Sequence, residues 1–473
     1  MNAESEYFFR HAVMRDAAYQ LQLPGDRARL HALAFEVLEA HCGGRAPEAP
    51  PLIPGDDTPM PPHPSDAFAL ELADHARQGE SAEREKAAGL LYLRRAAVGA
   101  TRFFRGEIAL SLWQQIAGES EGLDMGEALR RAGEVAILLG RNAPAGALFE
   151  RAISLFRAAG DRRAELIALT SLAGLHRQTG RMEEAERAFG SALAAFRTAG
   201  DRRSECKTLA NLGHIYLETG RSREAESALT AAIAMARELQ DRTIEGITLM
   251  GLGNVLHRTG RSEEAGRLFE AALVIHREVS DRISEGMALT NLGTIAQETG
   301  RLEAAEQSHL AALARSRDTG DRRNEGVALG NLAGVYMINN RDVLADASYR
   351  DALAIHREVG NRKSEGITLA NLASLLCETG RAEEGLQTYQ QALAILREAR
   401  DPRPLGYFLC QSATHCFGRK PFASIAASWC EGARYLREFG DEATLARVRK
   451  AMRERCAEAG VPPLEETPAA GSE

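Results

Sequence analysis

The kinds of residue and segment that the sequence lacks exclude several classes of protein. Aromatic residues make up only 5% of the 473 residues, and no apolar run approaches the roughly 18 residues that a membrane-spanning helix needs. The N-terminus lacks the basic and then apolar stretch of a secretory signal. The net charge is −8, so no excess of positive charge is available for general binding to nucleic acid or anionic membranes. These absences predict a cytoplasmic protein that binds neither.

Motifs that carry chemistry are also missing. No G-x-x-x-x-G-K-[ST] phosphate-binding loop occurs, and the stretch IHREVGNRKSEG at 355–366 departs from a kinase catalytic loop in its Glu and in the offset of its Asn. The 7 cysteines lack a disulfide-framework spacing, which favours reduced thiols. We therefore expect no catalytic residue, no cofactor and no metal. Zinc-ligand spacing is absent from the C-terminal thiols and imidazole, Cys410, His415, Cys416, Cys430 and Cys456.

Self-similarity, in contrast, is abundant. Four columns of polar residues hold one register through six or more copies, and such a register predicts a repeat architecture. An Arg that mostly follows Gly recurs at intervals of 40, at Arg141, Arg181, Arg221, Arg261, Arg301, Arg341 and Arg381. The same step separates Asp161, Asp201, Asp241, Asp281, Asp321 and the variant Asn361. It also separates the glutamates Glu165, Glu205, Glu245, Glu285, Glu325 and Glu365. A fourth column, of arginines, runs from Arg157 to Arg397 at the same step.

Each repeat contains two helical patterns. In the repeat that begins at Asp281, apolar residues lie at helical spacing over 283–299 and again over 302–319. Asp281 is a candidate N-cap of the first helix. Gly300 is a candidate C-cap, because glycine enters the left-handed conformation without steric cost. Two helices of this length, joined by tight turns, predict a helical hairpin that stacks on its neighbours.

The Arg and Glu columns favour a structural role. Arg282 and Glu285 lie about one helical turn apart, so they are expected to pair within or between repeats. Exposed pairs of this kind contribute about 0–1 kcal/mol each, although a continuous ladder would help to fix the register. Phosphate binding by the Arg columns is the alternative.

The triplet Asn291-Leu292-Gly293, followed by Ala305, resembles the tetratricopeptide consensus, in which small residues allow the two helices to cross closely. The 40-residue form is similar to polarity adaptors with Leu-Gly-Asn repeats, to kinesin light chains and to many bacterial signalling proteins. The regular copies cover about 163–400, and less regular pairs precede and follow them. This resemblance implies an all-α fold, a right-handed α-solenoid of stacked helical hairpins.

The same resemblance implies that a column of Asn residues faces a concave groove, where an amide can bond to the backbone of an extended peptide. The alternative, that each Asn bonds within its own hairpin or to water, stays open. Neighbouring positions are mostly neutral or apolar, which favours an internal, partly apolar peptide over a C-terminal carboxylate. The candidate groove residues are Lys207, Asn211, His214, Asn254, Asn291, Asn331 and Asn371.

The N-terminal stretch 7–41 does not fit the repeat and predicts two amphipathic helices that separate near Pro24-Gly25. It resembles the helical end of the ATPase module of large bacterial signalling proteins, where that end precedes a tetratricopeptide arm. The resemblance implies a signalling ATPase or kinase as a partner or as an upstream part; a simple cap for the solenoid is the alternative. The matching residues are Phe9, His11, Arg15, Ala17, Ala18, Tyr19, Arg29, Leu30, His31 and Glu39.

The predicted organisation has six parts: a helical stub (1–45), a Pro-rich linker (46–65), irregular helical repeats (66–160), six regular repeats (161–400), a degenerate repeat with a capping helix near 442–459 (401–460), and a disordered tail (461–473). Eight of the 16 prolines fall within 46–64, so this segment is expected to be extended and to stay outside any packed core.

The leading functional hypothesis is a non-enzymatic scaffold or adaptor in bacterial signal transduction that binds a peptide in its groove. The alternative is the regulatory or sensor arm of a split or truncated ATP-dependent signalling protein that controls kinase, cyclase or transcriptional output. Self-association through the end helices is a third possibility.

Overall fold

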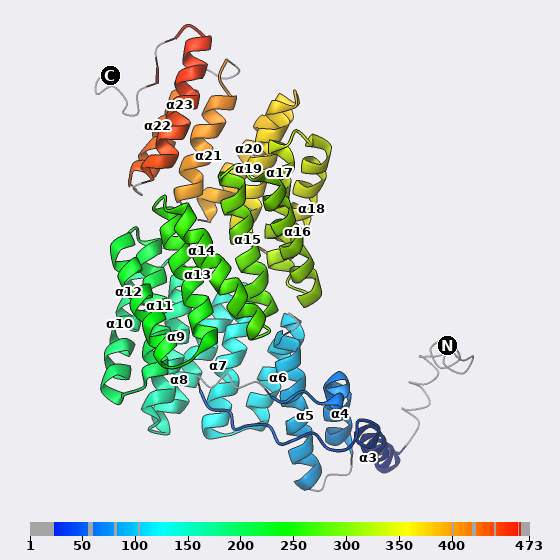
Figure 1. Cartoon of the computed structure of the whole chain (residues 1–473). Helices are drawn as coiled ribbons and strands as arrows, with labels where there is room; N and C mark the ends of the chain where they lie inside the picture. The colour runs from blue at the N-terminus through cyan, green and yellow to red at the C-terminus, as the bar shows by residue number, and fades with distance from the viewer. Residues whose placement is uncertain are drawn as a thin grey trace, which may run out of the picture. The chain divides into compact units, whose positions relative to one another are not determined.

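The structure, a computed structural model, describes residues 23–54, 60–79, 83–102, 105–399, 402–418, 422–438, 441–461 and 463–464. These residues form α-helices and one short 3-10 helix, and they contain no β-strand (Figure 1). The predicted all-α fold class is therefore confirmed. None of the helices described is both long and apolar enough to cross a membrane.

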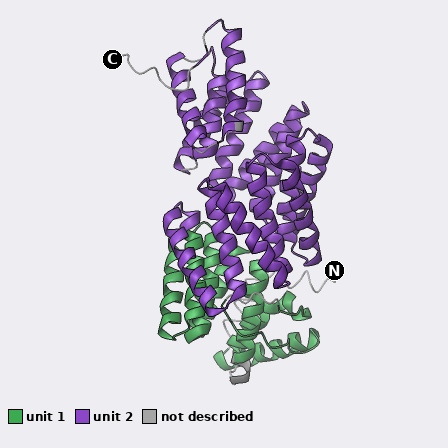
Figure 2. Cartoon of the chain, turned by 60° about the vertical axis from the view of Figure 1, so that its left-hand side comes forward, with its two compact units in different colours: residues 1–175 green, residues 176–473 purple. Residues whose placement is uncertain are grey.

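The chain divides into two compact units, residues 1–175 and 176–473 (Figure 2). Unit 1 contains α3 (Pro24–His41), a 3-10 helix (Pro64–Phe68), α4 (Ala69–Gln78), α5 (Glu83–Arg102), α6 (Gly106–Glu119), α7 (Gly122–Leu138) and α8 (Asn142–Ala158). The division falls inside α9 (Arg162–Gln178).

Unit 2 is an α-solenoid in which each helix packs on the next one along the chain. Its first hairpins comprise α10 (Met182–Ala199), α11 (Arg202–Glu218), α12 (Ser222–Glu238), α13 (Arg242–Arg258), α14 (Ser262–Glu278), α15 (Arg282–Glu298) and α16 (Leu302–Thr319). The later ones comprise α17 (Arg322–Ile338), α18 (Asp342–Glu358), α19 (Arg362–Glu378), α20 (Ala382–Glu398), α21 (Pro402–His415), α22 (Phe422–Glu438) and α23 (Glu442–Glu458).

The helix ends lie where the sequence predicts them. The Asp281 side chain accepts a hydrogen bond from the backbone N–H of Ser284 at 3.1 Å, as an N-cap should. Gly300 has φ of 74°, in the left-handed region. Asn340 occupies the same turn position in another hairpin, and Gln240 and Ser280 occupy the corresponding position in two of the turns between hairpins, all at φ of 54–56°. Glycine is therefore the usual residue at this position, but other residues also adopt the conformation.

The small residue of each first helix makes room for a large side chain from the second. A Cβ atom at Gly293 would lie 2.5 Å from Cε1 of His309, and one at Gly253 would lie 2.5 Å from Cε1 of Phe269. His309 and Ala305 are both fully buried. Since neither glycine could carry a side chain without a shift of its neighbour, these positions fix how closely the two helices of a hairpin approach.

The expectation that the Glu column forms exposed ion pairs is wrong, because these glutamates are buried. Glu245 is 5% exposed, and its carboxylate accepts from Arg237 Nε at 2.7 Å and from Arg242 Nη1 at 2.6 Å. Arg237 belongs to the preceding hairpin, so the bond joins two hairpins. Glu165, Glu205, Glu325 and Glu365 have the same two kinds of donor.

The pair that the sequence singles out is the exception. Glu285 accepts from Arg277 at 3.0 Å and lies 3.4 Å from Arg315, whereas Arg282 forms no ion pair with any residue described. At the end of α16, Asp318 occupies the position of Glu238, Glu278, Glu358 and Glu398, which pair with the arginines equivalent to Arg282, and it pairs with Arg315 instead.

The Pro-rich segment also differs from its prediction, because its described part is packed within unit 1. Ala46 and Leu52 are buried, at 3% and 6% exposure, and belong to the hydrophobic core. The Ala46 N–H donates to the Tyr92 hydroxyl at 3.2 Å, and Arg163 donates to the Pro54 carbonyl at 2.9 Å. An extended backbone can lie on helices where their side chains satisfy its polar groups.

The chain termini can be compared with the sequence only in part. α3 begins at Pro24, where the second helix of the N-terminal stretch is predicted, and the first predicted helix lies outside the described residues. The matches from Phe9 to Tyr19 lie there too. α23 occupies the position of the predicted capping helix. Most of the predicted disordered tail lies outside the described residues.

Candidate functional site

The first helices of the hairpins line the inner side of unit 2. Cα atoms of α11 and α13, α15 and α17, and α17 and α19 come within 8 Å of one another at several positions, which no two successive second helices in the described part do. Ion pairs between His257 and Glu298 and between Arg177 and Glu218 link successive first helices in the same way. The first helices are thus crowded together, which places them on the concave side.

Five of the predicted groove residues are asparagines of these inner helices, and their side-chain amides are half-buried. Within the part of the chain that the structure describes, none of the five donates or accepts a side-chain hydrogen bond. Each amide has two donors and an acceptor, so each keeps its full capacity for a bond to another molecule. The five are Asn211, Asn254, Asn291, Asn331 and Asn371.

Lys207 and His214 are engaged with the next hairpin. Burial opposes the ionisation of Asp241, but the Ile244 backbone amide, Arg203 and Lys207 together hold its pKa below the usual range. Burial, and secondarily the charge of Arg177, lowers the pKa of His214 to about 4. The structure thus gives both residues contacts that a free ligand-binding side chain would lack.

The position of His214 explains a break in the Asn column. A Cβ atom at Gly251 would lie 2.9 Å from Cε1 of His214. Since α11 and α13 are successive inner helices, the imidazole occupies the space that a side chain at 251 would need. Gly251 therefore stands where other inner helices have Asn, and Asn254 supplies the amide one turn further along α13.

One further residue of the column is missing from the predicted groove set. Gln411 of α21 lies 40 residues after Asn371, so one more step along the sequence would have found it. It lines a hollow of about 450 Å³ formed by α19, α21 and α23. Other residues of this hollow are Glu378, Tyr407, His415, Arg447 and Arg455.

A buried polar chain ends at this hollow. The Ser374 Oγ lies 2.6 Å from the Tyr389 hydroxyl, which lies 2.9 Å from Nδ1 of His415. Burial raises the pKa of Tyr389 well above its usual range, so the phenol stays protonated. Ser374 is only 1% exposed, so its hydroxyl cannot meet a substrate as a nucleophile does. We interpret the chain as a polar network of the core.

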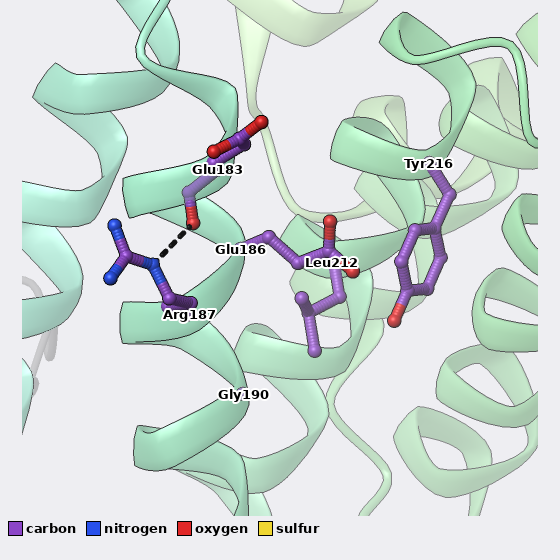
Figure 3. Close-up of a pocket in the computed structure, with 6 residues that line it drawn as sticks. All are labelled: Glu183, Glu186, Arg187, Gly190, Leu212 and Tyr216. Atoms are coloured by element: carbon purple, nitrogen blue, oxygen red, sulfur yellow. Dashed lines mark hydrogen bonds between the residues drawn. The ribbon is translucent and has the colours of Figure 1, made fainter.

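A second hollow, of about 480 Å³, lies between α10 and α11 (Figure 3). Gly190 leaves space on α10, and Leu212 and Tyr216 form the opposite wall on α11. The acidic side is occupied within the protein, because Glu186 pairs with Arg221 at 2.5 Å and the Arg221 guanidinium lies over the Tyr216 ring. None of the seven predicted groove residues lines this hollow.

No constellation for metal chemistry is present in the described residues, where no three His, Cys, Asp or Glu side chains are placed to hold an ion. None of the four C-terminal cysteines forms a disulfide with another described residue, and three of them, Cys410, Cys416 and Cys456, are buried.

Several solved structures are similar to this chain at low sequence identity. The Rap protein complexed with competence and sporulation factor has 13% identity and a TM-score of 0.54 over 71% of this chain and 92% of its own. The signal-transduction ATPase with a tetratricopeptide repeat sensor from Pyrococcus horikoshii has 14% identity and a TM-score of 0.48, over 93% of this chain and 67% of its own. The quorum sensor NprR from B. thuringiensis has 15% identity and a TM-score of 0.48, over 70% of this chain and 93% of its own.

Curated proteins give no match in sequence. The tetratricopeptide repeat family model, in contrast, matches four overlapping or successive stretches, residues 124–198, 164–238, 245–318 and 324–398. These stretches contain the regular repeats, the Glu and Arg columns and the inner Asn column, and together they cover more than half of the sequence. The chain therefore belongs to the tetratricopeptide repeat family.

Proposed function

We propose that this protein is a non-enzymatic scaffold or adaptor whose inner groove binds an extended segment of a partner protein. The observation that carries the proposal is the row of five half-buried amides without a partner in the described chain. A half-buried amide of this kind loses part of its hydration on folding, and it can exchange its remaining bonds to water for bonds to a ligand. A cytoplasmic setting in bacterial signal transduction is part of the proposal.

An extended peptide offers what these amides lack. Each of its residues has a backbone N–H and a C=O, and an Asn amide can serve both at once. Beside the amides, the inner helices present aliphatic side chains: Ile247 and Met287 are each 42% exposed, and Val327 is half-buried. Several weak polar contacts along the groove would fix the peptide backbone, and apolar contacts would select its side chains.

The combined substitution Asn291→Ala and Asn331→Ala tests the proposal. It should weaken binding of the cognate partner, recovered with the full chain as bait, by roughly tenfold, since two bonds of about 0.5–1.5 kcal/mol are lost. The free energy of unfolding should fall by less than about 1 kcal/mol, because neither amide has a partner in the fold. Equal affinity in a calorimetric titration of the variant and the natural chain would contradict the proposal.

Gln307→Ala with Gln390→Ala is the matched control. Both glutamines are exposed residues of second helices and have no hydrogen-bond partner in the described chain. The control therefore removes two amides from outside the groove, and it should leave both the affinity and the stability unchanged.

A second candidate function, the arm of an ATP-dependent signalling protein, is favoured by an exposed apolar stripe on α3. Leu30, Leu33 and Val37 lie at helical spacing and are 49%, 56% and 59% exposed. Two matches to the ATPase-module pattern have contacts in unit 1: Glu39 accepts from the Tyr92 hydroxyl at 2.8 Å, and His31 Nδ1 lies 2.8 Å from His75 Nδ1. The stripe would suit a surface that packs on an ATPase module.

Leu33→Asp with Val37→Asp tests this second candidate. The variant should lose co-purification with a signalling ATPase or kinase encoded beside its gene and should keep the peptide affinity of the groove. Undiminished co-purification of the variant would count against an ATPase contact at α3.

A further inference from the structure

The inner surface of α17 departs from those of its neighbours. We call the residues one helical turn apart on this side the inner stripe; in α17 they are Arg323, Val327, Asn331, Gly334 and Ile338. At the two ends of this inner stripe, Arg323 and Ile338 give the surface a different charge from that of the equivalent residues in other inner helices.

At the first end, Arg323 is exposed and has no ion-pair partner among the residues described. The equivalent arginines are occupied: Arg203 pairs with the N-cap Asp241 at 2.8 Å, and Arg403 pairs with the N-cap Asp441 at 2.9 Å. The N-cap that would receive Arg323 is Asn361, which has no charge and whose Oδ1 accepts from the Ser364 N–H. The guanidinium charge of Arg323 is therefore not neutralised.

At the other end, Ile338 is 49% exposed. The equivalent position carries Glu218 in α11, Glu298 in α15 and Glu378 in α19. In α13 this position is Arg258, so among the inner helices from α11 to α19 those that lack the glutamate are α13 and α17. A carboxylate on a ligand that lay along α17 would meet no negative side chain there.

The two acidic residues at the start of α17 do not neutralise Arg323. Glu325 is 6% exposed and accepts from Arg317 at 2.9 Å and from Arg322 at 2.6 Å. Asp321 is 4% exposed and caps the helix through the N–H and side chain of Asn324. Both carboxylates are already occupied by other donors.

The preceding inner helices supply no charge at the Arg323 position. The equivalent residues are Thr243 in α13 and Ile283 in α15, and the next positions along their inner stripes are Ile247 and Met287. At this end the groove is therefore neutral and aliphatic over α13 and α15, and an unneutralised cation follows on α17. Arginine binds carboxylates through two parallel N–H donors, which adds geometric selectivity to the charge attraction.

From this arrangement we infer that the peptide in the groove carries an aspartate or glutamate that pairs with Arg323, and an apolar side chain that packs on Met287 and Val327. The inference rests on the proposed peptide-binding function, because it specifies the chemistry of the ligand of that same groove. The acidic residue selects among partner segments, whereas the Asn amides bind the backbone of any of them.

Selection of peptides from a random decapeptide phage library on the full chain tests the inference. The natural chain should enrich sequences with one acidic residue at a fixed distance from an aliphatic or aromatic residue. Arg323→Ala should lose this acidic enrichment, and a synthetic peptide of the enriched sequence should bind it about tenfold more weakly, as expected for a charge-assisted bond. Exchange of the acidic residue for its amide should weaken binding to the natural chain equally and binding to Arg323→Ala not at all.

Arg282→Ala is the matched control, since Arg282 is also exposed at the start of an inner helix and has no ion pair in the described chain. It should select the same acidic peptides as the natural chain. Arg323→Lys should retain part of the affinity, which separates charge from shape. Because Arg323 bonds to no described residue, its removal should leave the thermal unfolding midpoint unchanged.

The outcomes separate this inference from the proposed function. Peptides selected without an acidic residue, or an acidic enrichment that persists in Arg323→Ala, would overturn the inference and leave groove binding intact. Failure of the natural chain to select any peptide whose binding depends on Asn291 and Asn331 would overturn both.

Discussion

The glutamates near the start of the inner helices and the asparagines in the middle of the same helices recur at the same step of 40 residues, yet they differ in their surroundings. Glu245 is buried and has two arginine donors, one of which comes from the preceding hairpin. Asn291 is half-buried and has no side-chain partner in the described chain. The two columns belong to the same helices, so the helix itself does not cause the difference.

This difference separates residues that hold the solenoid together from residues that are available to a ligand. A repeated polar residue whose hydrogen bonds are all made within the fold contributes to stability. A repeated polar residue with unused capacity contributes little to stability and can recognise another molecule. The regular step in the sequence is the same for both, so regularity alone cannot assign a function.

The largest effect is expected where a polar group is buried and also lacks a partner. His309 is fully buried, and neither of its ring nitrogens has a hydrogen-bond partner in the described residues. Burial lowers the pKa of His309 and His356 to about 4, and it also lowers the pKa of His276, which faces Asp281 at 3.7 Å. These imidazoles must be neutral in the folded chain.

Acid should therefore destabilise this part of unit 2. The unfolded chain binds the extra protons with pKa near 6.5, so stability is complete above that pH and falls as the pH drops towards 4. Near pH 4.5 His309 and His356 should each reduce the free energy of unfolding by about 2 kcal/mol, since one pKa unit corresponds to about 1.4 kcal/mol, and His276 should add to the loss in the same direction. Differential scanning calorimetry across this pH range would measure the loss.

The combined substitution His276→Phe, His309→Phe and His356→Phe is the matched variant, because other hairpins have Phe269, Phe196 and Phe156 at the equivalent buried positions. It should remove most of the pH dependence between 6.5 and 4. An undiminished acid response in this variant would show that other groups cause it.

The next largest effect is expected from Glu245→Ala. The substitution removes two charge-assisted hydrogen bonds from a buried site and should lower the free energy of unfolding in urea by about 2 kcal/mol. The arginine donors lower the pKa of Glu245 against the opposing effect of burial. The contribution of Glu245 is therefore complete above its ordinary pKa of 4.5 and is lost only at lower pH, so urea denaturation at neutral pH measures the whole of it.

Glu303→Ala is the control for this substitution, because Glu303 is an exposed first-turn residue of α16 without an ion pair in the described chain. It should change the stability by less than about 0.5 kcal/mol. If Glu245→Ala cost no more than Glu303→Ala, burial and pairing of the Glu column would not matter to stability.

The smallest effect sharpens the comparison within one column. Arg203→Ala removes the 2.8 Å pair with Asp241 and should lower the free energy of unfolding by about 0.5–1 kcal/mol, as expected for a half-exposed pair. Arg323→Ala removes no bond in the described chain and should leave the free energy of unfolding unchanged. Urea denaturation of both variants would detect the difference, and equal losses would contradict the assignment of Arg323 as unneutralised.

Much of the fold follows from local signals in the sequence. Asp281 as an N-cap and Gly300 in the turn act on residues within a few positions, so they define helix ends without knowledge of the rest of the chain. The burial of Glu285 does not follow in this way, because its donor Arg277 comes from another hairpin and its neighbour Arg315 from the second helix of its own.

The packing of the Pro-rich segment and the break at Gly251 have the same explanation. Composition predicts that residues 46–54 are extended, but only the positions of Tyr92, Arg163 and the core determine that this extended chain is covered. The sequence shows that Gly251 interrupts the Asn column, but only the position of His214 on the neighbouring helix shows what takes the space. The candidate Asn positions could thus be predicted from the sequence. That their amides and the Arg323 guanidinium have no partner in the described chain could not.

The bonds between hairpins have a consequence for how the gene can change. Arg237 serves Glu245, Arg277 serves Glu285 and Arg317 serves Glu325, so the donor that each hairpin offers is the one that every following hairpin needs. Unequal recombination between the gene segments that encode two hairpins would therefore remove or add one whole hairpin. Each pair of neighbouring hairpins would still have an arginine donor and a glutamate acceptor. The length of the groove can evolve by whole repeats in single recombination events, ahead of any change in the residues that line it.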